Sequence, residues 1–281
     1  MKERLASRSI DSIRSKPALM NTKAGLKSKR PVFLLPLGFG LLFLAVWQLK
    51  GFHWLFHLEL YQLPIPSSIA TAIRDNSTLL WSYSLYTGSE MLGGCLIGSF
   101  LGLLAAAAAT WFPGTGKGGI TILASLNAVP IVALAPVMNN WFGAGIASKI
   151  AIVSVMTMAT MAVIAFKGLR SIDPTSIELM HAFAAGKFQV FIKLRLRAAL
   201  PYLFTALRIN MSTSMIGAIV GEFFISSRGL GFLLSDQIKL GNMPLAWACI
   251  AIAAVLGILL YYLVQLSERL IIPWHAAQRK L

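Results

Sequence analysis

Residues 85–111 read LYTGSEMLGGCLIGSFLGLLAAAAATW, an apolar run that contains one charged residue, Glu90. A helix rises about 1.5 Å per residue, so about 20 apolar residues carry it across the hydrocarbon layer of a bilayer. The run exceeds that length and therefore predicts a membrane-spanning helix.

Five further apolar stretches are long enough, or nearly long enough, to span a membrane. They cover residues 32–49, 120–138, 150–166, 203–225 and 245–266. The whole chain is 57% hydrophobic and 12% charged, with a mean hydropathy of +0.72, which departs from soluble proteins toward bilayer-embedded ones. We predict an all-α polytopic membrane protein with about six transmembrane helices.

The 25 Lys and Arg residues, which give the chain a net charge of +15, lie between the apolar runs. A nucleic-acid-binding protein would instead spread them over a solvated surface. Because basic loops resist translocation, their distribution predicts that both termini are cytoplasmic. Five are assigned to the outer side: Lys50, Arg74, Lys149, Arg228 and Lys239.

The first 30 residues are polar and basic, with Glu3 and Asp11 as their only acids. We expect residues 1–30 to form a disordered cytoplasmic tail and residues 31–281 to form the transmembrane domain. An organelle transit peptide has a similar composition and is the alternative interpretation.

Two of the expected spans carry small residues every four positions, a spacing that lets another helix backbone approach closely. These residues are Gly94, Gly98, Gly102 and Ala106 in one span, and Thr213, Gly217 and Gly221 in the other. The pattern predicts a tightly packed bundle.

Polar residues gather around two prolines in the 120–138 span and just after it. Pro130 and Pro136 each lack a backbone donor, so carbonyl groups are freed that must face protein or a water-lined cavity. Asn127, Asn139 and Asn140 lie nearby in sequence. Asn127, Pro130, Asn139 and Asn140 are therefore candidates for lining a translocation pathway, and satisfaction of the kinks is the alternative.

Two carboxylates, Glu90 and Glu222, lie within or at the edge of apolar spans, where a charge is costly unless it is paired or neutralised. Glu222 can make a structural or gating hydrogen bond, or contact a solute as a further pathway candidate. Arg208 lies too close to the cytoplasmic end of its span to be an assured partner for Glu222.

The loop at residues 167–203 is the one sizeable cytoplasmic connection. Asp173 and Pro174 predict a helix start, and Gly186 predicts its end in a left-handed conformation. The intervening residues have a broad apolar surface that must be buried. Periodicity alone leaves two partners open, the bilayer surface and another protein.

This loop resembles the EAA loop of binding-protein-dependent ATP-binding cassette (ABC) importer permeases, whose pattern is Glu-Ala-Ala, three residues, Gly, nine residues, then Ile-x-Leu-Pro. The residues that correspond to its coupling segment are Glu178, Leu179, Met180, His181, Ala182, Phe183, Ala184, Ala185 and Gly186. Departures from the pattern are Leu179, Met180, Ala184 and Arg197, which replace Ala, Ala, Gly and Pro.

Flanking segments are similar to permeases for nitrate, sulfonates, taurine and pyrimidine precursors. They are AVPIVALAP (128–136), WFG (141–143), GEFF (221–224), RGLG (228–231) and LPIPS (63–67). The resemblance covers residues 63–270.

The resemblance implies the type I ABC importer permease (MetI-like) fold in a bacterial inner membrane. The coupling segment would contact a separate ATPase subunit, which binds ATP and Mg²⁺, while this chain binds no cofactor. Two copies of the chain would form the pathway, and a periplasmic or lipid-anchored binding protein would deliver the solute. The loop is most similar to permeases for pyrimidine-type vitamin precursors.

An enzymatic role has little support in the sequence. Residues 114–118 read GTGKG, but Gly118 stands where a phosphate-binding loop needs Ser or Thr, so we expect a flexible turn. The His and Cys residues lack metal-ligand spacing, so we expect no metal site. The main alternative is an ion-coupled secondary transporter that uses Glu90 or Glu222, and a membrane-embedded enzyme ranks third.

Overall fold

The computed structural model describes residues 34–273, which form helices and turns without a β-strand. The expected basic tail at residues 1–30 and both chain termini lie outside the described residues. The structure divides into two units between Ala45 and Val46. The helix α1 (Leu34–Gln48) crosses this division and covers the described part of the expected 32–49 span except its last residue.

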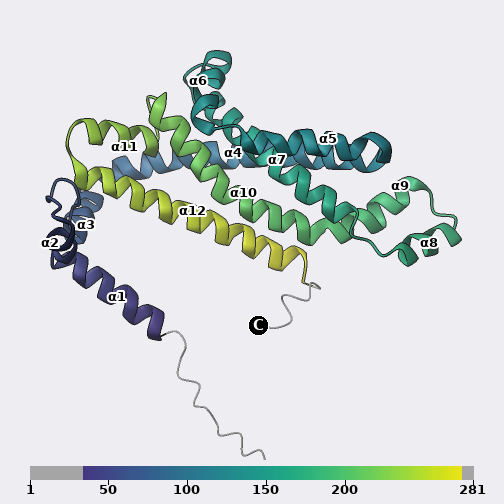
Figure 1. Ribbon diagram of the computed structural model, residues 1–281, viewed down its shortest axis with the longest axis horizontal. Coiled ribbons are helices and arrows are strands. Elements are labelled where there is room, and N and C mark those ends of the chain that lie inside the picture. Colours follow the sequence, from purple (N-terminus) through teal and green to yellow (C-terminus); the bar gives the residue numbers. More distant parts are fainter. Residues whose placement is uncertain (1–33, 274–281) are drawn as a thin grey trace, which may run out of the picture. The chain divides into compact units, whose positions relative to one another are not determined.

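Four of the expected spans are confirmed as helices long and apolar enough to cross a bilayer. They are α4 (Ser77–Trp111), α7 (Ile146–Leu169), α10 (Arg197–Phe224) and α12 (Met243–Ile271). Figure 1 shows these four helices running alongside one another within the second unit. Many of their large apolar side chains are exposed, as expected for surfaces that face lipid.

The expected span at residues 120–138 is not one continuous helix. The chain forms α5 (Pro113–Ser125), the 3-10 turn η2 (Leu126–Ala128) and α6 (Ile131–Phe142), and the two helical parts meet at an angle of 99°. Pro130 explains the break, because it has no N–H to continue the helix and it disfavours a helical conformation at Val129. Val129 is accordingly extended, with φ −72° and ψ 124°.

The GTGKG segment is also not a flexible turn, since it lies in the first turns of α5. The connection from α4 is short, and Gly116 packs directly on the end of α4. A Cβ atom at Gly116 would lie 2.0 Å from the Ala109 carbonyl oxygen. The absence of a side chain there therefore permits the sharp reversal between α4 and α5.

Shorter helices connect the spans. They are α2 (Gly51–Phe56), α3 (Pro66–Asp75), α8 (Pro174–Ala182), α9 (Lys187–Val190), the π-helical turn η3 (Phe191–Leu196) and α11 (Leu230–Lys239). The connection between α7 and α10 is shorter than the expected loop at residues 167–203, because α9, η3 and α10 form one continuous helical segment, Lys187–Phe224. Pro201 lies inside that segment, five residues after the π-helical turn. A proline is tolerated there because the i→i+5 hydrogen bonds of the π turn locally widen the helix.

The small residues of α4 lie against α7, as the sequence predicted. A Cβ atom at Gly98 would lie 2.1 Å from Thr157 Oγ1 and 2.3 Å from the Ser154 carbonyl oxygen. The Thr157 and Ser154 hydroxyls both donate to the Gly94 carbonyl at 3.2 Å. Close backbone approach and hydrogen bonds across the interface together hold α4 on α7.

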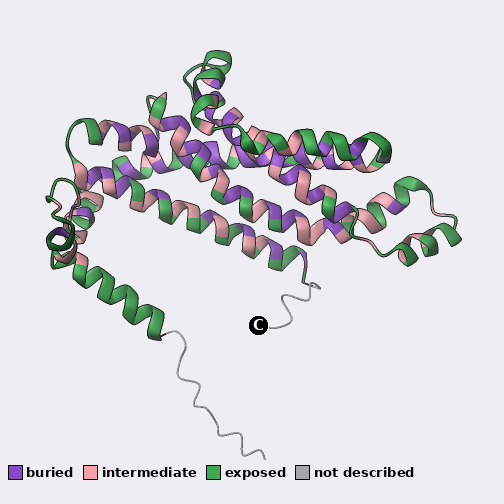
Figure 2. Cartoon of the chain, in the orientation of Figure 1, coloured by how far each residue is buried: buried purple, intermediate pink, exposed green. Residues whose placement is uncertain are grey.

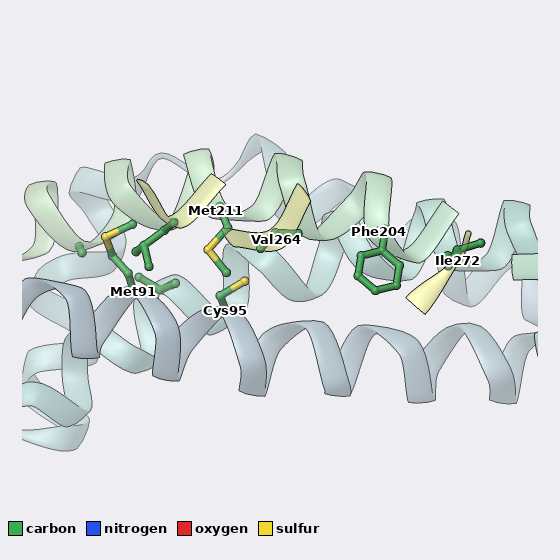
Figure 3. Packing of buried hydrophobic residues seen from close by; sticks show 9 residues of the cluster. Met91, Cys95, Phe204, Met211, Val264 and Ile272 are labelled. Carbon is green, nitrogen blue, oxygen red and sulfur yellow. The ribbon is translucent and has the colours of Figure 1, made fainter. Parts of the chain in front are cut away.

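The helix α10 packs on both α4 and α7. Asn210, fully buried, donates to Ser99 Oγ at 2.9 Å and to the Thr157 carbonyl at 3.0 Å, so one amide joins three spans. Figure 3 shows the adjoining apolar cluster, in which Met91 and Cys95 of α4 lie near Met211 of α10. Figure 2 shows that the buried surfaces lie mainly where α4, α7 and α10 meet.

Candidate functional site

The helix α8 begins where the sequence predicted. The Asp173 side chain accepts a hydrogen bond from Thr175 N at 3.2 Å, and Pro174 is the first helical residue. This arrangement satisfies an amide group that the first turn leaves unpaired.

The predicted end of α8 is wrong. The left-handed residue is Ala184, with φ 53°, whereas Gly186 has φ −68° and precedes α9. Ala185 N donates to the Met180 carbonyl and Ala184 N donates to the His181 carbonyl, which is the Schellman arrangement. Ala184 is also the residue that stands where the EAA pattern has Gly, so the backbone has the conformation that this Gly favours.

The helix α8 has two different faces, because residues two apart point about 200° apart around a helix. Ile177 and His181 line a pocket shared with the end of α4. Leu179 and the adjoining Phe183 point away from it and are 58% and 77% exposed. Figure 2 shows that α8 has no buried residue, so its outer face has no apolar partner among the described residues.

The pathway candidates on α5 to α6 fall into two groups. Asn127 and Pro130 lie at the break, where Asn127 Oδ1 accepts from Thr160 Oγ1 at 3.3 Å. Asn139 and Asn140 lie in the last turns of α6, and the buried Asn139 Oδ1 has no hydrogen-bond partner among the described residues. Asn127 and Pro130 thus lie just before the start of α6, and Asn139 and Asn140 lie near its other end.

Glu222, near the end of α10, is fully buried and binds the start of α11. Its Oε2 accepts from Gly231 N at 2.7 Å, and its Oε1 accepts from Thr87 Oγ1 at 2.7 Å. Thr87 Oγ1 in turn accepts from Leu230 N at 2.9 Å. The carboxylate thus links α4, α10 and α11, which is the structural hydrogen bonding that the sequence left open beside solute contact.

Gly229 makes this contact possible. It has φ 107°, and a Cβ atom there would lie 2.0 Å from Glu222 Oε1. Only Gly fits this position, because other residues rarely adopt this φ and because any Cβ atom would overlap the Glu222 carboxyl group. The sequence alone did not single out Gly229 or Thr87. The two glycines of the RGLG segment (228–231) do, however, indicate a turn.

Two more ionisable side chains are buried with Glu222. Glu90 and Lys149 are 0% and 1% exposed, and both lie within electrostatic range of Glu222. Lys149 Nζ also donates to the Ala144 carbonyl at 2.7 Å. Lys149 lies in the first turn of α7, and its side chain is buried in the bundle within electrostatic range of two carboxyl groups.

The two Glu90 carboxyl oxygens make no hydrogen bond of ordinary geometry within the described residues. Arg208, as expected, is not the partner of Glu222, since its Nε pairs with Glu268 Oε2 at 3.4 Å. No group of three His, Cys, Asp or Glu side chains among residues 34–273 could hold a metal ion. In the buried cluster of Thr87, Glu90, Lys149 and Glu222, the hydrogen bonds between helices are those of Thr87 and Glu222.

Comparison with known proteins agrees with this architecture. Residues 98–273 match the family described as "binding-protein-dependent transport system inner membrane component". The riboflavin transport system permease protein RibX of Chloroflexus aurantiacus is 30% identical over 84% of this chain and 88% of its own length. The formylaminopyrimidine transport permease protein ThiX of Halalkalibacterium halodurans is 29% identical over 86% of this chain and 96% of its own length.

A putative aliphatic sulfonates transport permease protein, SsuC of Bacillus subtilis, is 28% identical over 82% of this chain and 84% of its own length. Among solved structures, a chain of the inward-facing MetNI methionine ABC transporter aligns with a TM-score of 0.58. It is 19% identical, and the alignment covers 70% of this chain and 96% of that one, so it shows the fold. The protein therefore belongs to the binding-protein-dependent transport system inner membrane components, the permease subunits of ABC importers.

Proposed function

We propose that two copies of this chain form the membrane-spanning part of an ATP-driven importer for a small organic solute that contains a pyrimidine ring. ATP and Mg²⁺ would be bound by separate ATPase subunits, and a solute-binding protein would deliver the solute from outside. Both termini would lie in the cytoplasm.

One observation carries the mechanical part of the proposal. A capped helix, α8, lies between two spans and exposes Leu179 and Phe183 to solvent. Apolar groups of this size gain about 1.5–3 kcal/mol each when they are buried, so a binding partner is favoured. An ATPase subunit that grips α8 could transmit its own movement to the spans α7 and α10 on either side.

The solute class rests on the relatives. Riboflavin and formylaminopyrimidine, which appear in the names of two of them, share a pyrimidine ring. The EAA-type loop of this chain also most resembles pyrimidine-precursor permeases. Aliphatic sulfonates are the second candidate, because a sulfonate permease is similar over most of the chain.

Family membership favours the importer over an ion-coupled secondary transporter. Glu222 also has a structural use that needs no transported ion. Glu222 is fully engaged by Gly231 N and Thr87 Oγ1.

Reconstitution in liposomes tests the proposal. The chain would be purified with the ATPase and binding protein that accompany it from its native membrane. We expect accumulation of labelled riboflavin or an aminopyrimidine to require ATP and both partners. A proton gradient imposed on liposomes that contain the chain alone should give no accumulation, and uptake under that gradient would contradict the proposal. ATP-dependent uptake of taurine but not of pyrimidines would show that the solute is a sulfonate. The proposal of an ATP-driven importer would still hold in that case.

A further inference from the structure

A pocket of about 320 Å³ lies where the end of α4 meets α8, α9 and η3. Its size falls in the range of small-ligand sites. Nothing in the proposed transport cycle uses it, because it lies on the face of α8 opposite Leu179 and Phe183.

The pocket is lined by three nitrogen-rich side chains, His181, Lys187 and Arg195, and by no acid. Within the described residues, none of the three forms an ion pair with a carboxylate. Arg195 Nη1 donates to the Leu169 carbonyl at 3.2 Å, which orients the guanidinium and leaves its other N–H groups available. These groups suit a phosphate, which accepts several charge-assisted hydrogen bonds at once.

Aromatic rings form the wall nearest to the spans. Trp111, the last residue of α4, lies with its ring 5.9 Å from that of Phe191. Trp side chains at the ends of membrane helices typically lie at the level of lipid headgroups. The pocket therefore lies where headgroup phosphates are concentrated.

An apolar strip leads from the pocket into the membrane-spanning part of α4. Leu101, Leu104 and Trp111 share one side of the helix, and they are 44%, 49% and 45% exposed. An acyl chain could lie along this strip while its headgroup occupies the pocket. A soluble anion would use only the basic side chains.

We propose that this pocket binds the phosphate of an anionic phospholipid from the cytoplasmic leaflet. Lys187 and Arg195 neutralise the phosphate, His181 donates a hydrogen bond, and Trp111 packs on the glycerol region. The bound lipid connects α8 to α4, and so steadies the helix that the ATPase is proposed to grip.

Native mass spectrometry of the full chain in detergent tests this inference, with phosphatidylglycerol and phosphatidylcholine added separately. We expect preferential retention of phosphatidylglycerol. The Lys187→Gln variant should weaken it about fivefold, because one basic residue near an anionic headgroup contributes about 1 kcal/mol. Lys193→Gln is the matched control, since Lys193 lies outside the pocket on the same segment. It should retain phosphatidylglycerol like the unmodified chain.

His181→Ala provides a second variant that removes the proposed donor and leaves the Arg195 hydrogen bond to Leu169 in place, and it should weaken retention in the same direction. Inorganic phosphate is the competing probe for a soluble ligand. Equal retention of the two lipids, equal losses in Lys187→Gln and Lys193→Gln, or displacement of the lipid by inorganic phosphate would each overturn the proposal. So would loss of the co-purifying ATPase in Lys187→Gln with unchanged lipid retention, since the pocket would then belong to the protein interface.

Discussion

Ala184 holds a backbone conformation that is unfavourable for alanine. A left-handed residue other than Gly costs about 1–2 kcal/mol, and Ala184 has φ 53° at the end of α8. The Schellman hydrogen bonds from Ala184 N and Ala185 N hold it there. The end of α8 is thus a locally strained point in the segment proposed to contact the ATPase.

We predict that Ala184→Gly stabilises the end of α8 by about 0.5–1 kcal/mol, since Gly adopts this φ without steric cost. Ala184→Val should have the opposite effect, because a β-branched residue is disfavoured there. Hydrogen exchange of the amides at residues 183–185 measures both changes. Gly186→Ala is the control, because Gly186 has φ −68° and no atom lies within 4 Å of an added Cβ. Faster exchange in Ala184→Gly than in the unmodified chain would contradict the prediction.

Thr87 serves two partners with one hydroxyl, as donor to Glu222 Oε1 and acceptor from Leu230 N. Thr87→Val keeps the shape but leaves two buried groups unsatisfied, so we expect a loss of about 1–3 kcal/mol or more. The melting temperature of the detergent-solubilised chain should fall. Thr213→Val is the matched control, since the Thr213 hydroxyl bonds the Ile209 carbonyl of its own helix. Equal melting temperatures for the two variants would contradict the assigned role of Thr87.

At the scale of elements, the interface of α4 with α7 depends on the absence of side chains. A Cβ atom at Gly98 would overlap the Ser154 carbonyl oxygen, which is backbone and cannot rotate away. Hydrogen bonds from the Ser154 and Thr157 hydroxyls to the Gly94 carbonyl cross the same interface. A larger residue would therefore separate the helices and stretch these bonds.

We predict that Gly98→Ala destabilises the bundle by about 1–3 kcal/mol, the usual cost of overpacking a well-packed core. Gly88→Ala in the same helix should be tolerated, because the atom nearest to its added Cβ, in the Leu256 side chain, is 3.8 Å away. Thermal unfolding followed by circular dichroism compares the two variants. If both melt at the temperature of the unmodified chain, the close approach of α4 and α7 is not limiting.

At the scale of the whole molecule, the described part of the second unit is a bundle of long apolar helices, and α8 lies in a connection between two of them. The spans bury their small and polar residues against one another and leave large apolar side chains on the outside. The outer face of α8 has the same apolar character but lies in the connection between α7 and α10. Its exposed side chains are thus available to a second protein.

Replacing both Leu179 and Phe183 by Ser should reduce co-purification of the ATPase at least tenfold, because about 1.5–3 kcal/mol per apolar side chain is lost from the interface. The melting temperature of the chain itself should not change, since neither side chain is buried within it. Leu240→Ser is the control, because Leu240 is 70% exposed at the end of α11. Undiminished co-purification and ATP-dependent uptake in the double variant would exclude α8 as the contact.

The sequence by itself determined the four long spans, the start of α8 and the packing side of α4. Each depends on local properties, namely the length of an apolar run, a cap next to a proline, and small residues at helical spacing. The EAA-type loop and the flanking permease-like segments together likewise indicated the family that the comparison shows.

The tertiary structure decided the 99° break near Pro130, the left-handed Ala184 in place of Gly186, and the burial of Lys149 with Glu90 and Glu222. Hydrogen bonds such as that between Thr87 and Glu222 join residues 135 positions apart. Such pairs form only when separate helices pack. Inside a bilayer a polar side chain has no water to bind, so its hydrogen-bond partner is a group on its own helix or on a neighbouring helix. The local sequence determines which donors, acceptors and apolar groups each helix carries. The packing of the helices determines which of these groups come into contact.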